Sequence, residues 1–191
     1  MPMKLNERRC LKADETSSTS AALERLPLRE LNLFETGPNG FMDAGTYRSI
    51  ARIPTLETLT INKLDWNLLD VLAESAVTRL EVTHANGIPF GELRRLRGLR
   101  SLYFYSDDGE ILGAEAFDFP AREWLDIKNV EMESLRCLSG LRALKTLHIY
   151  ASTCRDYAGL EELTGLEEIY CTGDQRAALR LRYPAAAWEY R

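Results

Sequence analysis

The sequence predicts an α/β repeat fold in which short strands and short helical segments alternate along the chain. Three features support this: a recurring apolar pattern, helical spacing between its copies, and a glycine after several helical segments. The pattern is an apolar residue, two variable positions, an apolar residue, one variable position and a last apolar residue. Its clearest copy begins at Leu144, where alternation predicts a strand with Leu147 and Ile149 facing the core.

The pattern occurs seven times at nearly constant spacing. Its central apolar residues are Leu31, Leu59, Leu80, Leu102, Leu125, Leu147 and Ile169. Their separations are 28, 21, 22, 23, 22 and 22 residues, and the copy around Leu125 is weaker because Arg122 occupies its first apolar position. A period near 22 indicates a repeat array, because one such unit buries its leucines only by stacking on its neighbours.

Four segments with helical spacing lie between the expected strands. They cover residues 66–74, 90–97, 133–138 and 157–163. Gly98, Gly140 and Gly165 follow three of them, and we expect these glycines to adopt left-handed caps that return the chain to the next strand. Two insertions, at 35–45 and 106–115, are expected to be turns. The second is acidic but lacks the ligand spacing of a calcium loop.

These features resemble the leucine-rich-repeat family over about residues 23–172, most clearly in the stretches from Leu138 to Ile149 and from Leu163 to Tyr170. The resemblance implies a curved solenoid with a parallel sheet on its concave side and short helices and turns on its convex side. The family usually places Asn or Cys three residues after the last apolar residue of each strand. The corresponding residues are Thr36, Leu64, Ala85, Asp107, Val130, Ser152 and Asp174. We therefore expect an atypical member that lacks the asparagine ladder and has irregular bends.

The expected organisation is about seven repeats between two terminal caps. Residues 1–22 are predicted to be an N-terminal cap or linker, with an edge strand at 9–13 and a polar linker at 14–20. The repeat array is assigned to residues 23–175. Residues 176–191 are predicted to be a C-terminal cap with a final strand, in which Trp188 helps to close the core.

Composition and charge argue against several classes of protein. A net charge of −5 and a pI near 5.2 disfavour a nucleic-acid partner. The cluster of Arg94, Arg95, Arg97 and Arg100 alternates with leucines, as on a solvated helix face. No apolar run is long enough to span a membrane, and the N-terminus lacks the apolar core of a secretory signal. The four cysteines form no C-x-x-C pair, so we expect a cytoplasmic protein with free thiols.

The sequence carries no recognisable catalytic motif. It contains no nucleophile elbow, no phosphate-binding glycine loop and no zinc-protease helix motif. Its two histidines, His84 and His148, lie about three repeats apart, too far to share a metal ion. Cys171 should face the core while His148 faces away from it, which argues against a Cys–His pair. We expect a non-enzyme without catalytic residues, metal or cofactor.

The strand residues that alternate with the core leucines are rich in aromatic side chains. Six of the 21 positions flanking the central apolar residues are aromatic, against 9% of the whole chain. Aromatic residues also favour strands and stack on cross-strand neighbours, so a purely structural role is an alternative. We interpret the enrichment as a protein-binding surface, because Tyr and Trp anchor interfaces. The candidate binding residues are Tyr103, Tyr105, Trp124, Asp126, Lys128, His148, Tyr150 and Tyr170.

The leading functional hypothesis is a non-catalytic module that binds another protein through this aromatic concave face. Within this class, a small acidic protein suits an inhibitor or immunity-type role against a basic target. The alternative is a structural or adaptor scaffold, or a repeat protein that associates with itself through a sheet edge. The expected state is a monomer or a weak homo-oligomer, and the sequence does not name the partner.

Overall fold

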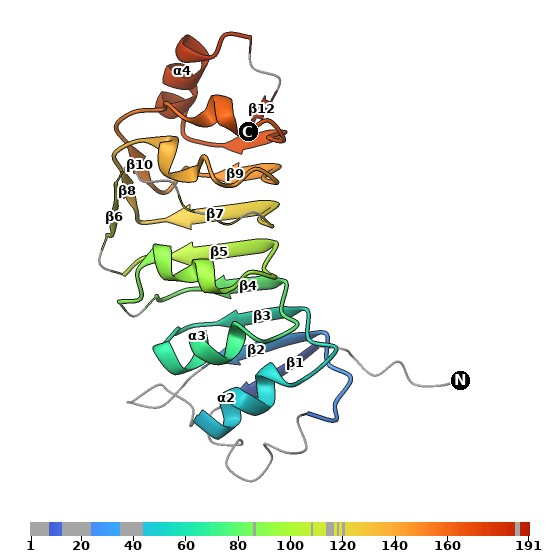
Figure 1. The fold of residues 1–191 in the computed structure, drawn as a ribbon. Helices are drawn as coiled ribbons and strands as arrows, with labels where there is room; N and C mark the ends of the chain where they lie inside the picture. The colour runs from blue at the N-terminus through green and yellow to red at the C-terminus, as the bar shows by residue number, and fades with distance from the viewer. Residues whose placement is uncertain are drawn as a thin grey trace.

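The computed structural model describes residues 8–12, 24–34, 44–85, 87–107, 109–113, 117, 119, 121–185 and 188–191. Within these residues the fold is α/β, with one parallel sheet forming one side of an elongated stack and helices lying on the other side (Figure 1). The expected linker at 14–20 lies outside the described residues, as do positions 35–43 of the first insertion and the side chain of Phe34.

The main sheet contains nine strands among the described residues, stacked in chain order (Figure 1). They are β1 Arg8–Lys12, β2 Glu30–Phe34, β3 Thr58–Ile61, β4 Arg79–Val82, β5 Ser101–Tyr105, β7 Trp124–Lys128, β9 Thr146–His148, β11 Glu168–Tyr170 and β12 Glu189–Tyr190. Every neighbouring pair is parallel. The edge strand expected at 9–13 is β1, and the expected final strand is β12.

The strand register reproduces the sequence period. Each central apolar residue pairs with its counterpart one pattern further along, in the order Leu31, Leu59, Leu80, Leu102, Leu125, Leu147 and Ile169. All seven of these side chains are completely buried. The recurring pattern therefore aligns equivalent residues across the sheet, and the alternation within each strand sends them to the same side.

Six helical segments in the described part of the chain connect the strands. They are α2 Ala44–Ala51, α3 Trp66–Leu72, η2 Phe90–Arg95, η3 Leu135–Leu138, η4 Leu160–Glu162 and α4 Gly173–Arg182. Of the four predicted helical segments only α3 is an α-helix, whereas the other three are 3-10 helices. Each of these three has only three to six residues, a length at which 3-10 turns are common because few i→i+4 bonds can form. Helix α2 was not predicted.

The prediction that glycines after the helical segments adopt a left-handed conformation was wrong. Gly98, Gly140 and Gly165 are not among the described glycines with positive φ. After η2 and η4 the chain leaves the helix through a leucine with φ of −85° and ψ of 68° or 69°, so no left-handed residue is needed there. Gly159 does adopt a positive φ, of 105°, but it stands at the N-terminus of η4 rather than after a helix.

The bends after three strands are more regular than expected. They form a second parallel sheet from β6 Ile111–Leu112, β8 Glu131–Met132 and β10 Thr153–Cys154. Strand β6 lies within the acidic insertion, which is therefore not only a turn.

Other polar side chains take over part of the role of the missing asparagine ladder. Ser152 donates from Oγ to the Ile127 carbonyl at 2.8 Å, and Asn129 donates from Nδ2 to the Ser106 carbonyl at 2.6 Å. Both bonds satisfy backbone groups of the preceding unit at a bend.

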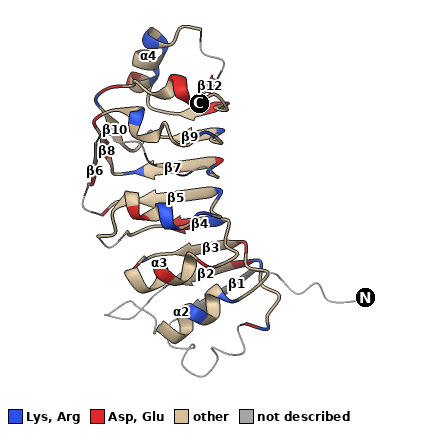
Figure 2. Ribbon diagram, in the orientation of Figure 1, with Lys and Arg blue, Asp and Glu red and all other residues tan. Residues whose placement is uncertain are grey.

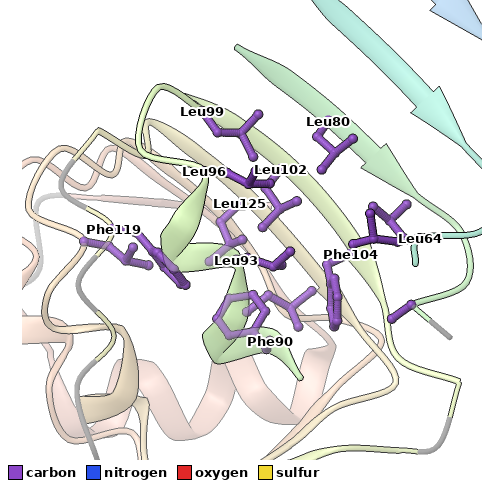
Figure 3. Packing of buried hydrophobic residues seen from close by; sticks show 14 of the residues in the cluster. Leu64, Leu80, Phe90, Leu93, Leu96, Leu99, Leu102, Phe104, Phe119 and Leu125 are labelled. Atoms are coloured by element: carbon purple, nitrogen blue, oxygen red, sulfur yellow. The ribbon is translucent and has the colours of Figure 1, made fainter. Parts of the chain in front are cut away.

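The core lies between the main sheet and the connecting segments. In Figure 3, Phe90, Leu93 and Leu96 from the η2 region point towards the strand residues Leu102 and Leu125. The arginines that alternate with these leucines stay at the surface: Arg94, Arg97 and Arg100 are exposed and Arg95 is half-buried, as the predicted solvated face requires. One face of this short segment thus packs on the sheet while the other meets solvent.

Helix α4 and β12 cover the C-terminal end of the described stack. Thr172 and Gln175 form a capping box at the start of α4, and the Gln175 amide also donates to the carbonyls of Ile149 and Ser152 at 3.2 and 2.8 Å. Trp188 packs against the core and meets Tyr183 edge-to-face, with ring centroids 5.5 Å apart. Trp188 therefore occupies the position expected of it from the sequence.

The three cysteines that the structure describes with side chains are free thiols. Cys137 and Cys171 are buried, and burial raises the pKa of Cys137 to about 12 and that of Cys154 to about 11. These thiols are protonated near neutral pH and pack as small apolar groups. No helix in the described part of the chain is long and apolar enough to cross a membrane.

Candidate protein-binding face of the sheet

Side chains of each strand alternate between the packed core and a second face, here called the open face. In β5, Leu102 and Phe104 are buried whereas Tyr103 and Tyr105 are partly exposed. Parallel pairing of equivalent positions then places open-face residues in a row across four strands. The row runs Tyr103, Asp126, His148 and Tyr170.

His148 lies at the centre of a cluster of aromatic rings. Its imidazole centroid is 4.0 Å from that of Tyr170, 5.0 Å from that of Trp124 and 6.2 Å from that of Tyr150. The Trp124 contact is edge-to-face, a geometry that aromatic pairs favour, and the two tyrosine contacts are tilted. The His148 side chain is only 16% exposed, so the surrounding rings hold it in place.

Lys128 lies between two tyrosine rings. Its Nζ atom is 4.8 Å from the ring centroid of Tyr103 and 5.0 Å from that of Tyr150, both within cation–π range. Burial disfavours the charged ammonium, but a hydrogen bond to Tyr150 and the charge of Asp126 more than offset this effect. The pKa of Lys128 therefore lies above its ordinary value.

Asp126 connects the two groups of rings. Its Oδ2 atom is 3.4 Å from Nδ1 of His148 and 4.0 Å from Nζ of Lys128. Although it belongs to the open face, Asp126 is only 5% exposed. Its Oδ1 atom is buried and has no hydrogen-bond partner among the described residues. One carboxylate oxygen thus lies near Nδ1 of His148 and Nζ of Lys128, and the other has no hydrogen-bond partner among the described residues.

Seven of the eight predicted residues come together in this way. They form what is called the aromatic patch below: Tyr103, Trp124, Asp126, Lys128, His148, Tyr150 and Tyr170. Tyr105 pairs in register with Lys128 across β5 and β7, but its ring meets that of His84, with 6.2 Å between the ring centroids. Tyr150 is the most exposed member, at 42%.

Sequence analysis missed Arg79 as a neighbour of the patch. Its guanidinium carbon lies 5.8 Å from the ring centroid of Trp124, and its guanidinium pairs with Glu81 at 3.1 Å. Arg79 and Trp124 occupy equivalent positions two strands apart, on either side of Ser101. The repeat period could have revealed this neighbour, because it places Arg79, Ser101 and Trp124 in one row across three strands. A long arginine side chain easily spans the small Ser101.

The geometry of the described residues does not assemble a metal site or a Cys–His pair. No group of three or more His, Cys, Asp or Glu side chains within the described ranges is arranged to hold a metal ion. His84 pairs with Asp107, with 2.7 Å between Nδ1 and Oδ1, while His148 belongs to the aromatic patch. Cys171 is buried in the core, on the other side of the sheet from His148.

Charges of both signs are interspersed along the stack rather than separated into a basic end and an acidic end (Figure 2). Near the patch most are paired: Arg191, for example, lies 3.2 Å from Glu168 and 2.8 Å from Glu189. The patch therefore offers large, rigid aromatic area with locally balanced charge, a composition typical of interface centres rather than of nucleic-acid surfaces.

Comparison with solved structures identifies the fold. The chain resembles a structure of the Toll–Spätzle complex from Drosophila, with a TM-score of 0.62 and 16% identity over 87% of this chain and 23% of the other chain. It also resembles an internalin from Listeria monocytogenes, with a TM-score of 0.51 and 17% identity over 80% of this chain and 56% of the other. No family model matches the sequence. No curated protein matches it at a significant level.

These similarities define the class of fold. Toll and internalin are leucine-rich-repeat proteins, so the chain has a leucine-rich-repeat-like fold, as the sequence resemblance predicted. The chain spans about a quarter of the Toll chain and just over half of the internalin chain. At 16–17% identity the likeness concerns the fold alone.

Proposed function

We propose that this protein is a non-catalytic module that binds another protein through its open face, with the aromatic patch as the main contact. The observation that supports this most directly is the clustering of five aromatic or imidazole rings and one Asp–Lys pair on adjacent strands of one sheet face. Rings held in fixed positions lose little conformational freedom when a partner binds, so their buried area contributes efficiently to affinity.

The proposal includes the finer architecture suggested by the sequence. The units form a curved solenoid of about seven repeats, with residues 176–191 as C-terminal cap and the open face on the concave side. In such an array each strand adds a row of side chains to one continuous surface. The structure of a Toll–Spätzle complex is an example of a similar fold solved with a protein partner, which supports this kind of use.

Within this class we favour an inhibitor or immunity-type protein that acts in the cytoplasm on a basic target. The net charge of −5 would accelerate encounter with such a target through long-range attraction. Light scattering on the purified protein tests the scaffold alternative: a monomer mass that is independent of concentration argues against self-association. A mass that increases with concentration favours a self-associating scaffold.

The double substitution Trp124→Ala/Tyr150→Ala tests the proposal. It removes the two rings that flank His148 and Lys128, so we expect the affinity for the partner to fall by at least about 100-fold. The partner is captured from a lysate of the source organism and identified by mass spectrometry, and its affinity is then measured by calorimetry. Circular dichroism should show that the fold is retained.

The matched control is Trp66→Ala/Leu181→Ala. Both residues are exposed apolar side chains, 49% and 86% exposed, and they lie on α3 and α4 rather than on the open face. This control should bind the partner with unchanged affinity. If Trp124→Ala/Tyr150→Ala also leaves the affinity unchanged, the aromatic patch is not the binding surface.

A further inference from the structure

An open groove of about 480 Å³ separates parts of α2 and α3, which lie side by side on the helix side of the stack (Figure 1). Its lining from the α2 segment consists of Ala44, Arg48, Ala51 and Arg52. Its lining from the α3 segment includes Asp70, Val71 and Glu74. Residues three and four positions apart share one face of a helix, so each row follows its helix and the groove runs between them. The groove is thus separate from the open face, which belongs to the main sheet.

The two walls of this groove carry charges of opposite sign. Arg48 and Arg52 make the α2 wall basic, whereas Asp70 and Glu74 make the α3 wall acidic, and all four residues are exposed. Figure 2 shows the basic band on α2 and the acidic band on α3. No ion pair among the described residues joins one wall to the other: Arg52 and Asp70 pair with residues outside the groove, and Arg48 and Glu74 form no ion pair within the described ranges. Both walls are therefore open to charges of an occupant.

The apolar part of the lining is made of small side chains. It consists of Ala44 and Ala51 from α2 and Val71 from α3, so no apolar side chain larger than valine lines the groove. Small residues let a neighbouring helix approach closely, since the distance between packed helices depends on the side chains at the contact. A large apolar side chain that fills the groove must come from the occupant. A second copy of this surface would bring the same small residues and would leave the groove unfilled.

The backbone around the groove favours a helical occupant over an extended one. Main-chain groups of α3 bond within the helix: the Leu69 amide donates to the Asp65 carbonyl at 2.9 Å, and the Ala73 amide to the Leu69 carbonyl at 3.2 Å. An extended segment in the groove would find no strand edge to pair with, and its own buried N–H and C=O groups would lack partners. A helix satisfies its backbone internally and presents side chains in rows three and four residues apart.

We propose that the groove between α2 and α3 is a second docking site, which receives an amphipathic helix of a partner protein. The apolar row of this helix packs on the small side chains of the floor. Acidic side chains on one of its flanks face Arg48 and Arg52, and basic side chains on the other flank face Asp70 and Glu74. The charges fix the position of the helix in the groove, and its apolar side chains supply the buried area. This site does not depend on the proposed function of the open face.

The probe is an alanine-rich helical peptide of about 18 residues, with leucines at i and i+4, glutamates along one flank and lysines along the other. Fluorescence anisotropy of the labelled peptide should give a Kd of about 100 μM or lower. A helix can enter the groove in either direction, so this peptide always has one orientation that matches both walls. Peptides with lysine on both flanks, or glutamate on both, should bind at least about tenfold more weakly, because one wall then faces a like charge.

Two results with these peptides would overturn the inference. One is the absence of saturable binding of the mixed peptide up to about 1 mM. The other is equal binding of the peptide with lysine on both flanks, which would indicate general attraction to an acidic protein rather than recognition by two walls.

A charge exchange locates the peptide without altering the net charge. Arg48→Glu/Glu74→Arg places one opposite charge in each wall and should weaken binding of the mixed peptide by at least about tenfold. The matched control Arg97→Glu/Glu162→Arg makes the same exchange at exposed positions that do not line the groove, and it should leave binding unchanged. Equal weakening by both exchanges would contradict recognition by the groove.

A second variant blocks the groove without touching its charges. Ala44→Trp places a large side chain in the space that the helix would occupy, and it should weaken peptide binding by at least about tenfold. The control Ala177→Trp adds the same side chain at an exposed position of α4 and should have no effect. Unchanged binding in both Ala44→Trp and Arg48→Glu/Glu74→Arg would place the peptide elsewhere. The charge exchange and the wild-type peptide series give a result even if Ala44→Trp folds poorly.

The groove and the aromatic patch are tested separately. Trp124→Ala/Tyr150→Ala should leave peptide binding unchanged, and loss of binding in this variant would mean that the peptide contacts the patch instead of the groove. A failure of the patch to bind its own partner leaves the groove inference standing. A second copy as the occupant would appear in light scattering as a mass that increases with concentration in the wild type but not in Ala44→Trp, and this result would also overturn the inference.

Discussion

At the scale of single residues, Arg122 shows how a charged side chain can occupy a position that the repeat assigns to leucine. It is 1% exposed, and its guanidinium reaches back to the preceding unit, where it donates to the carbonyls of Leu93, Leu96 and Leu99. Burial lowers the pKa of Arg122 to about 10. The arginine thus satisfies backbone acceptors where η2 turns back towards β5, and its guanidinium carbon also lies 5.1 Å from the ring centroid of Phe119.

Replacing Arg122 by Ala should destabilise the protein by about 3 kcal/mol, since it removes donors from buried carbonyls and leaves a cavity. Urea unfolding followed by fluorescence measures the change. The control Arg97→Ala, on the exposed side of the same region, should stay within about 0.5 kcal/mol of the wild type. Similar values for both variants would show that the hydrogen bonds of Arg122 contribute little net stability.

At the scale of elements, Gly159 allows one connecting turn to pack tightly on the preceding one. Its φ of 105° lies in the left-handed region, and a Cβ added there would come within 2.6 Å of the Cα atom of Arg136, which is part of η3. The contact is with backbone, which cannot move aside without displacing η3. A side chain at this position is therefore excluded by both conformation and space.

Gly159→Ala should cost about 2–4 kcal/mol, combining backbone strain with a clash against Arg136. Gly173→Ala is the matched control, because nothing lies within 4 Å of a Cβ at this position in the first turn of α4. That control should be neutral or stabilising by up to about 1 kcal/mol, since alanine restricts the unfolded chain and favours a helix. Thermal unfolding midpoints measure both, and equal midpoints would refute the close approach.

At the scale of the whole molecule, stability depends on neighbour contacts along the stack. Strands β5, β7 and β9 each pair on both sides, whereas β12 pairs only with β11 in the main sheet. Among the described strands of this sheet, each pairs only with its immediate neighbours in the stack. Local opening should therefore begin at an end of the sheet and proceed inwards.

Amide hydrogen exchange under native conditions should show this gradient. Backbone amides of β5 and β7 are expected to exchange at least about tenfold more slowly than those of β12, because opening the centre breaks pairing on two sides. Mass spectrometry of peptic fragments resolves the strands. Uniform protection from β2 to β12 would instead show that the stack opens only by global unfolding.

Much of the fold follows from the sequence because burial and alternation act locally. Leu102 and Leu147 could be placed in the core from a two-residue alternation, and the 22-residue period predicted that Asp126 and His148 would be neighbours. The 3-10 character of η2, η3 and η4 and the second sheet β6–β8–β10 did not follow. Both depend on how adjacent units fit together, since β8 and β10 are only two residues long and form by pairing with each other.

By itself, the sequence determined which strand residues are buried, which line the open face, and which lie opposite each other on neighbouring strands. These depend on a pattern that every unit repeats, and stacking has one register that buries all the leucines together. Only the tertiary structure decided that Lys128 lies between Tyr103 and Tyr150, that Tyr105 contacts His84, and that one oxygen of Asp126 has no hydrogen-bond partner among the described residues. Those outcomes depend on side-chain rotamers, and each rotamer depends on contacts with neighbours that are some twenty or more residues away in the chain. The local sequence around each residue does not specify those contacts.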